Sequence, residues 1–301
     1  MKKHTILAAL SILISFPLLS SDQEKTYKDA LGHTLTLRSP PQRIVSLAPN
    51  ITEILFSLGL DQSIVGVTRY CDYPVEARTK DRIGGMVDPN LEKIKALHPD
   101  LVIGFRGNPL RVLERIRSLR LPLFVLDMGN NLESVFSLIE RIGAVTQREK
   151  EAEGVLANMR GKYSKIEKTL QNVSHRPKVF FSLHGLGLWT CGKGSFLDDL
   201  AQKAKGINIA GKVDRKWLHF NKEELIHENP EVIIVLARSQ EEFRRSRQWL
   251  KREKSFAGIQ AVAEDNIRFL DANMATRPGP RLVDALSELA RILHPHCFEK
   301  Q

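Results

Sequence analysis

The sequence predicts an α/β protein with two lobes, each built on a mainly parallel sheet, joined by one long α-helix. Short apolar runs alternate with helical patterns along most of the 301 residues, which is typical of βαβ units. One segment, 147–172, keeps a helical pattern for much longer than the others. A pattern found before this segment is repeated after it, which favours two related lobes on either side of a bridging helix.

The predicted bridging helix is amphipathic. Apolar side chains recur every three or four residues, and Lys, Arg and Glu fill the other faces. If 147–171 is helical throughout, it is about 37 Å long, enough to cross from one domain to another. From periodicity alone, it could equally be a surface helix of a single domain. Its apolar positions are Ala152, Val155, Leu156, Met159, Tyr163, Ile166 and Leu170.

Residues 1–21 predict a secretory signal peptide. A short basic start precedes an almost unbroken apolar run, and two serines at its end suit a cleavage site near residues 20–22. The run is shorter than the roughly 20 apolar residues that span a bilayer, which makes a membrane anchor the weaker alternative. No Cys follows it, which disfavours a lipid-anchored protein. We therefore expect a periplasmic protein.

Charge and cysteine content narrow the function classes. The net charge is +10, and the densest basic cluster, 244–247, lies on a predicted polar helix. Because the chain is expected to be exported, nucleic acid is not an expected partner. The three cysteines, Cys71, Cys191 and Cys297, have no metal-ligand spacing, so zinc is not predicted. An odd number of cysteines cannot all pair within the chain, and the sequence leaves their disulfide state open.

The first half predicts a short hairpin followed by a lobe of alternating strands and helices. An N-terminal extension, 22–42, carries the hairpin, and the first lobe covers 43–146. Pro49 and Asn50 are expected to form a turn. The expected strands are 44–48, 64–67, 101–104 and 123–126, and the expected helices are 52–58, 91–97, 109–119 and 132–144.

The second lobe, 173–301, predicts the same alternation. A loop is expected to run as far as Trp217. The expected strands are 178–183, 188–190, 232–236 and 267–270, and the expected helices are 195–204, 222–228, 240–252 and 281–293.

One sequence pattern occurs in both lobes. Residues 90–103, NLEKIKALHPDLVI, match residues 221–234, NKEELIHENPEVII, in residue type along their length. Both predict a capped helix, a proline that stops it, an acid and a buried strand. This repeat favours two related lobes over one domain.

Enzyme motifs are weak in this sequence. Residues 187–193 satisfy most of a phosphate-binding loop, but Gly194 stands where Ser or Thr should reach magnesium. The chain contains neither G-x-S-x-G nor H-E-x-x-H. Nucleotide hydrolysis, serine hydrolysis and zinc proteolysis therefore lack support.

Aromatic residues beside the predicted strands indicate a binding cleft. Ligands of parallel sheets bind at the carboxyl ends of the strands, and aromatic rings there offer flat apolar walls. For each residue alone, a place in the core or rim is the alternative. The candidates are Tyr70, Phe105, Trp189 and Trp217.

Further side chains are candidates for metal or anion binding. Tyr70, His184 and His219 could ligate iron, with a structural hydrogen-bonding role as the alternative for each. Arg277 and Arg281 lie in RPGPR, where the prolines could hold both guanidinium groups to clamp carboxylates or phosphate. The alternative is a surface turn with solvated arginines.

Five segments together resemble the solute-binding proteins of iron-chelate and cobalamin ABC importers, the long-helix-bridged class III, and within it the cobalamin-binding branch. They are RIVSLAPNITEILFSLG, RYCDYP, NLEKIKALHPDLVIG, NKEELIHENPEVIIV and RPGPRLVDAL, from residue 43 to the last predicted helix. The resemblance implies a non-enzymatic receptor without an intrinsic cofactor. It would capture cobalamin or a related corrinoid for an ABC permease that works with a cytoplasmic ATPase, and we expect it to be a monomer.

The resemblance also implies roles for single residues. Tyr70 and Phe105 would face the ligand from the first lobe, and Trp217, Arg277 and Trp189 from the second. A further pair, one acid on each lobe, would dock onto arginines of the permease, and two equivalent acids suit a two-fold symmetric partner. This pair is Glu92 and Glu223.

Two loops depart from the cobalamin pattern and keep other ligands open. Residues 85–88, GMVD, stand where tryptophan is expected, and Met274-Ala275 replace large aromatics. Haem with Tyr70 or a histidine as axial ligand is the first alternative, followed by a ferric siderophore held by Arg277 and Arg281. A secreted α/β enzyme using Cys71 with Asp72 and a free metal-ion receptor are the alternatives from other classes.

Overall fold

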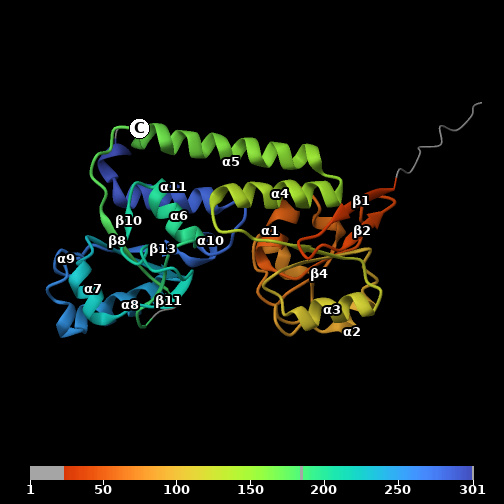
Figure 1. The fold of residues 1–301 in the computed structure, drawn as a ribbon, viewed down its shortest axis with the longest axis horizontal. Helices are drawn as coiled ribbons and strands as arrows, with labels where there is room; N and C mark the ends of the chain where they lie inside the picture. The colour runs from red at the N-terminus through yellow and green to blue at the C-terminus, as the bar shows by residue number, and fades with distance from the viewer. Residues whose placement is uncertain (1–23, 184–185, 300–301) are drawn as a thin grey trace, which may run out of the picture.

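The structure is a computed structural model that describes residues 24–183 and 186–299. The predicted signal peptide, 1–21, lies outside these residues. Two lobes stand side by side under one long helix (Figure 1). Within the described residues, no helix combines the length and the apolar character needed to cross a bilayer.

The first lobe is built on a parallel sheet of five strands in the order β5-β4-β3-β6-β7. Its central strands are β-branched and apolar, and β3 and β7 are buried along their whole length. Such strands are covered by helices on both faces. Their bounds are β3 Ile44–Ser46, β4 Ile64–Val67, β5 Asp81–Arg82, β6 Leu101–Phe105 and β7 Leu123–Leu126.

Helix α1 begins earlier than the sequence indicated. The expected turn at Pro49 and Asn50 is wrong, because Pro49 is the first residue of the helix and Ala48 precedes it in an extended conformation. Proline suits this position, since its fixed φ is helical and its missing N–H would have no partner there. The helices of this lobe are α1 Pro49–Ser57, α2 Leu91–Ala96, α3 Leu110–Ser118 and α4 Leu132–Thr146.

An antiparallel hairpin, β1 Lys25–Lys28 and β2 Thr34–Leu37, precedes this sheet. The buried carboxylate of Asp29 accepts hydrogen bonds from the backbone N–H groups of Leu31 and His33 in the hairpin turn. It also forms a salt bridge with Arg117 of α3. Asp29 therefore fastens the hairpin to the first lobe.

The second lobe contains a parallel sheet of four strands in the order β10-β8-β12-β13. A separate antiparallel ribbon pairs β9 with β11. The loop expected through Trp217 is wrong in part, because Trp217 begins β11. The strands are β8 Lys178–Ser182, β9 Trp189–Cys191, β10 Ile207–Asn208, β11 Trp217–His219, β12 Val232–Ala237 and β13 Ile267–Asp271.

Helices cover the second sheet as in the first lobe (Figure 1). Ser195 caps α6 through its hydroxyl, which accepts from the Asp198 N–H, and Ser239 caps α8 in the same way. The helices are α6 Phe196–Lys203, α7 Lys222–Glu228, α8 Gln240–Arg252, α9 Gln260–Ala263, α10 Ala272–Ala275 and α11 Leu282–Leu293.

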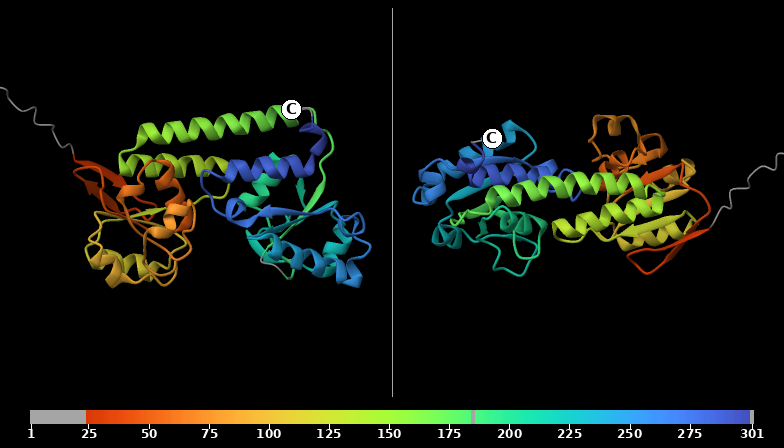
Figure 2. Two further views of the ribbon diagram at one scale, coloured as in Figure 1. Left: turned by 180° about the vertical axis from the view of Figure 1, so that it is seen from behind. Right: turned by 90° about the horizontal axis from the view of Figure 1, so that it is seen from above.

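Helix α5, Glu149–Leu170, bridges the lobes and packs on α4 of the first lobe and α11 of the second (Figures 1 and 2). A Cβ on Gly143 of α4 would lie 2.6 Å from Cβ of Ala152, so this glycine permits close packing. At the other end, Lys162 forms a 2.6 Å ion pair with Asp284 of α11. One apolar core cluster includes residues of both lobes and of α5. The predicted fold class is confirmed.

The repeated sequence pattern forms the same local structure in both lobes. Asn90 and Asn221 cap α2 and α7 through their side chains. Each helix is followed by a residue with positive φ, His98 at 45° and Asn229 at 47°, and then by a proline and a central strand. Figure 1 shows α2 and α7 at the ends of the lobes away from α5.

Candidate ligand-binding cleft

A cleft of about 1040 Å³ lies between the lobes. Its walls are formed by segments that follow β4, β6 and β7 in the first lobe and β8, β12 and β13 in the second. These are the carboxyl ends of parallel strands, where such sheets bind ligands. Pockets for drug-sized molecules measure about 300–1,000 Å³, so this cleft suits a bulky ligand.

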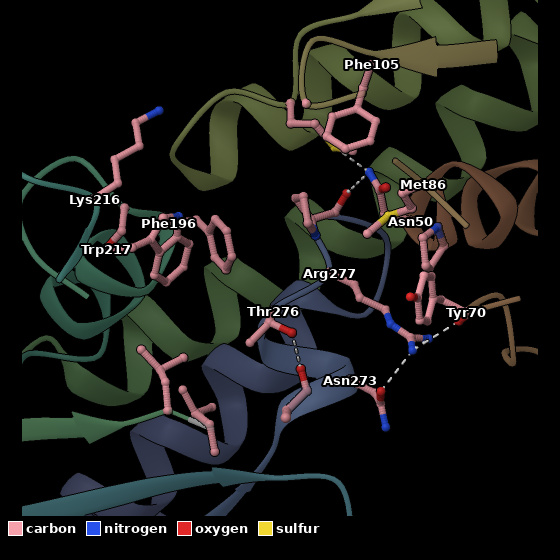
Figure 3. A pocket seen from close by; sticks show the side chains of 18 of the residues that line it. Asn50, Tyr70, Met86, Phe105, Phe196, Lys216, Trp217, Asn273, Thr276 and Arg277 are labelled. Carbon is pink, nitrogen blue, oxygen red and sulfur yellow. Dashed lines mark hydrogen bonds between the residues drawn. The ribbon is translucent and has the colours of Figure 1, made fainter. Parts of the chain in front are cut away.

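Aromatic side chains line both walls of the cleft. Tyr70 and Phe105 lie on the first-lobe side, and Phe196 and Trp217 lie on the second-lobe side (Figure 3). Tyr70 is 49% exposed and Trp217 is 38% exposed, so both offer ring surface to a ligand. The rings of Phe196 and Trp217 meet edge to face, with centroids 5.6 Å apart. Phe196 was not predicted from the sequence. It directly follows Ser195, the cap of α6, and the predicted residues likewise lie beside loops that follow strands or lead into helices.

The loop after β6 fixes the position of Phe105. Buried Asn108 accepts a hydrogen bond from the Phe105 N–H at 2.9 Å and donates to the carbonyl of Met86 at 2.8 Å. A Cβ on Gly107 would lie 2.0 Å from the Phe105 ring, so only glycine leaves room for this ring. The aromatic wall of the first lobe is therefore held by local contacts that the pattern Gly-Asn-Pro after the strand could have indicated.

Arg277 and Arg281 bind carboxylates of the first lobe. Arg281 donates to both oxygens of Glu53, at 2.9 and 2.7 Å. Arg277 donates to Glu53 at 3.2 Å and to Asp72 at 2.6 Å. We call these four residues the interlobe ionic cluster, because both arginines precede α11 of the second lobe while Glu53 and Asp72 belong to the first lobe.

Burial and charge oppose each other in the interlobe ionic cluster. Burial lowers the pKa of Arg277, but the hydrogen bonds and charges of Asp72 and Glu53 outweigh it and raise this pKa above its usual value. Burial raises the pKa of Asp72, and Arg277 more than reverses this, so the pKa lies below its usual range. Both groups are therefore charged at neutral pH.

The two arginines predicted to clamp a ligand contact groups of the protein itself. Arg277 lines the cleft, but its guanidinium already contacts Asp72, Glu53 and the carbonyl of Tyr70. Arg281 does not line the cleft and lies over the ring of Tyr73, 3.7 Å from its centroid. The sequence signal for their true partner was Glu53, a single acid among the buried residues of α1.

Trp189 and His219 lie together but away from the cleft. They are paired residues of β9 and β11, with ring centroids 6.5 Å apart, and neither lines the cleft. The structure therefore does not bring Trp189 to Tyr70, Phe105 and Trp217. His184 lies outside the described residues.

The described residues give little support to a protein-built metal site or to a reactive cysteine. In the part of the chain that the structure describes, no three His, Cys, Asp or Glu side chains come together as a metal site. Tyr70 lines the cleft, which leaves its phenol available to a metal held by a ligand. Cys71 is buried beside the hydroxyls of Thr52 and Thr68, and burial raises the pKa of its thiol. A thiol in this state is a poor nucleophile.

Glu92 and Glu223 occupy equivalent exposed positions. Each is the second residue of its helix, α2 or α7, and stands two positions after the asparagine that caps the helix. Acids in the first turn also stabilise a helix through its dipole. The helices that carry them lie on the two lobes at the ends away from α5 (Figure 1).

The fold and the cleft define a class: a two-lobed α/β solute-binding protein with a helical bridge. A family model described as periplasmic binding protein matches residues 44–274, so the chain belongs to this family.

Two relatives of this chain have names that state what kind of binding protein they are. An ABC transporter substrate-binding lipoprotein of Bacillus subtilis is 27% identical over 91% of this chain and 87% of its own length. A vitamin B12-binding protein of Vibrio cholerae is 27% identical over 84% of this chain and 90% of its own.

Solved structures agree with this assignment. The periplasmic haem-binding protein RhuT from Roseiflexus has a TM-score of 0.77 at 26% identity, covering 85% of this chain and 99% of its own. The vitamin B12-binding protein BtuF of Vibrio cholerae has a TM-score of 0.74 at 26% identity, covering 86% and 99%.

Proposed function

We propose that the protein is the substrate-binding component of an ABC importer and that it captures a bulky, flat metal chelate, with cobalamin or a related corrinoid as the first candidate. The observation that carries this proposal is the cleft with aromatic rings on both walls: Tyr70 and Phe105 on one side, Phe196 and Trp217 on the other. Rings on two facing walls suit a large flat ligand. Relatives named as vitamin B12-binding proteins support the corrinoid.

Haem is the second candidate ligand. Tyr70 offers a phenol in the cleft, and phenolate is an axial ligand of haem iron in some proteins. The similarity to the haem-binding protein of Roseiflexus supports the same reading. A ferric siderophore held by Arg277 and Arg281 has less support, because both guanidinium groups are engaged in the interlobe ionic cluster.

Calorimetric titration with cyanocobalamin, haemin and a ferric siderophore tests the ligand. We expect saturable binding of cyanocobalamin, since the cleft suits a bulky ring system. Absorption spectra of protein purified from its own host provide an independent check, because corrinoids and haem absorb in different regions. If none of the three ligands binds and the purified protein is colourless, the proposal is wrong.

We also propose that the protein is exported and that its chain divides into the domains given below. Residues 1–21 would be removed as a signal peptide, with cleavage near residues 20–22, and the mature protein would work in the periplasm. The first lobe would comprise 43–146 after the extension 22–42, and the second would comprise 173–301, with 147–172 as the bridge. Its partners would be the transmembrane permease subunits and their cytoplasmic ATPase.

Glu92 and Glu223 would dock onto the permease. They are exposed, one on each lobe, at the ends away from the bridging helix. We expect the double variant Glu92→Ala and Glu223→Ala to lose most ligand transport in cells while its ligand affinity stays within about twofold, because neither residue lines the cleft.

The control for docking is Glu153→Ala, which removes an exposed acid from α5, on the opposite side of the molecule. Transport by this variant should match that of the unchanged protein. Equal transport by the double variant and the control would show that the two acids stabilise only their own helices.

A further inference from the structure

The two walls of the cleft differ in whether their positively charged side chains form salt bridges with carboxylates. On the first-lobe wall, Arg69 forms a salt bridge with Asp88, and Arg106 forms one with Asp127 at 3.2 Å. Arg277 is held by Glu53 and Asp72, as described above. The cations that border this wall therefore each have a carboxylate partner.

The second-lobe wall carries two cations without such partners. Lys216 and Arg238 line the cleft and are exposed, and neither forms a salt bridge with any residue in 24–183 or 186–299. One acid, Glu242, shares this wall, but its carboxylate accepts the backbone N–H of Arg238 at 2.8 Å in the first turn of α8. Glu242 forms no salt bridge with the guanidinium of Arg238, so this guanidinium can bind another anion.

Lys216 lines the cleft within electrostatic reach of the opposite wall. The pKa of Asp127, on the first lobe, is held below its usual range first by the Gly129 N–H, against burial, and then by Arg106 and by the charge of Lys216. The ammonium of Lys216 therefore acts on the opposite wall without reaching it as an ion pair. Figure 3 shows Lys216 extending from the segment that carries Trp217.

The second-lobe wall has a further source of positive potential. Helix α6 begins in the cleft, and Gly194, Ser195 and Phe196 line it at that point. The N-terminus of a helix carries a partial positive charge. This potential adds to the two side-chain cations without forming a site by itself.

We propose that the ligand carries an anionic group at the edge of its ring system and that Lys216 and Arg238 bind this group. The inference rests on the proposed function and narrows its ligand. Lys216 and Arg238 line the same wall as Trp217 and Phe196, so a ligand that lies against these two rings has an edge on the side of the cations. A phosphodiester on a corrinoid and carboxylates on a porphyrin share the required chemistry.

Two ligand pairs, each with one member that lacks the anionic group, test the inference. Cyanocobalamin carries a phosphodiester, whereas dicyanocobinamide lacks the arm that bears it. Haemin carries two carboxylates, whereas its dimethyl ester has none. We expect the double variant Lys216→Ala and Arg238→Ala to bind, in one pair, the member that carries the anionic group about tenfold to hundredfold more weakly. Its affinity for the member that lacks the anionic group should change by about twofold or less. The pair that responds identifies the source of the anion.

Salt dependence and a charge-matched variant provide the controls. Raising the salt concentration should weaken binding of the ligand with the anionic group to the unchanged protein and affect the double variant less. Arg244→Ala with Lys254→Ala removes two exposed cations of the second lobe that do not line the cleft, and it should leave both affinities unchanged.

Two outcomes would contradict the inference in different ways. An equal loss of affinity for both members of a pair would show that Lys216 and Arg238 contribute shape and not charge. Failure of all four ligands to bind the unchanged protein would overturn the proposed function, and the anionic contact with it.

Discussion

Glu53→Gln is expected to lower the free energy of unfolding by about 3 kcal/mol. The side chain of Glu53 is 3% exposed and accepts hydrogen bonds from both Arg277 and Arg281. Glutamine has nearly the same shape but no charge, so Arg281 would remain partly buried without a carboxylate partner. Removing one member of a buried ionic group typically costs about 3–5 kcal/mol, because the remaining charge is uncompensated.

Urea unfolding of Glu53→Gln and of Glu76→Gln checks this expectation. Glu76 is exposed on the same lobe and forms no salt bridge with a described residue, so its substitution should change the free energy by about 0.5 kcal/mol or less. Similar values for the two variants would mean that the interlobe ionic cluster contributes no net stability.

The second large effect is expected at the aromatic wall. Trp217→Ala should weaken ligand binding by about tenfold to hundredfold, because truncating a tryptophan at the centre of a binding surface removes its stacking area. The variant also removes the edge-to-face partner of Phe196, which would leave that ring less firmly placed. Calorimetric titration with the ligand that binds the unchanged protein gives the measurement.

Trp189→Ala is the matched control for Trp217→Ala. Trp189 is 37% exposed, close to the 38% of Trp217, and lies on the same ribbon, but it does not line the cleft. Its substitution should change ligand affinity by about twofold or less. A loss as large as that of Trp217→Ala would mean that the ligand extends beyond the cleft to the position that the sequence predicted for Trp189.

Elements with long, regular patterns were predicted well from sequence. The bridging helix was expected at 147–172 and runs from Glu149 to Leu170, because its apolar positions recur at helical spacing from Ala152 to Leu170. Helix α8 was expected at 240–252 and has these bounds. The β9–β11 ribbon was not expected as a pair, because its strands are three residues long and each is defined by the other.

The candidate site was predicted less completely than the fold. Tyr70, Phe105, Trp217 and Arg277 line the cleft, because the rule that ligands bind at strand ends depends only on local element order. The partners of the arginines could not be found in this way. Glu53 is 224 residues from Arg277 in sequence, and only the packing of the two lobes brings them together.

The bridging helix has a consequence for how the protein denatures. Its buried face contributes Ala152, Leu156 and Met159 towards one end and Ile166 and Leu170 towards the other, all in a single apolar cluster that continues into both halves. If either half unfolds, nonpolar surface of the other half becomes exposed to water. We therefore expect the molecule to unfold as one cooperative unit in spite of its two sheets.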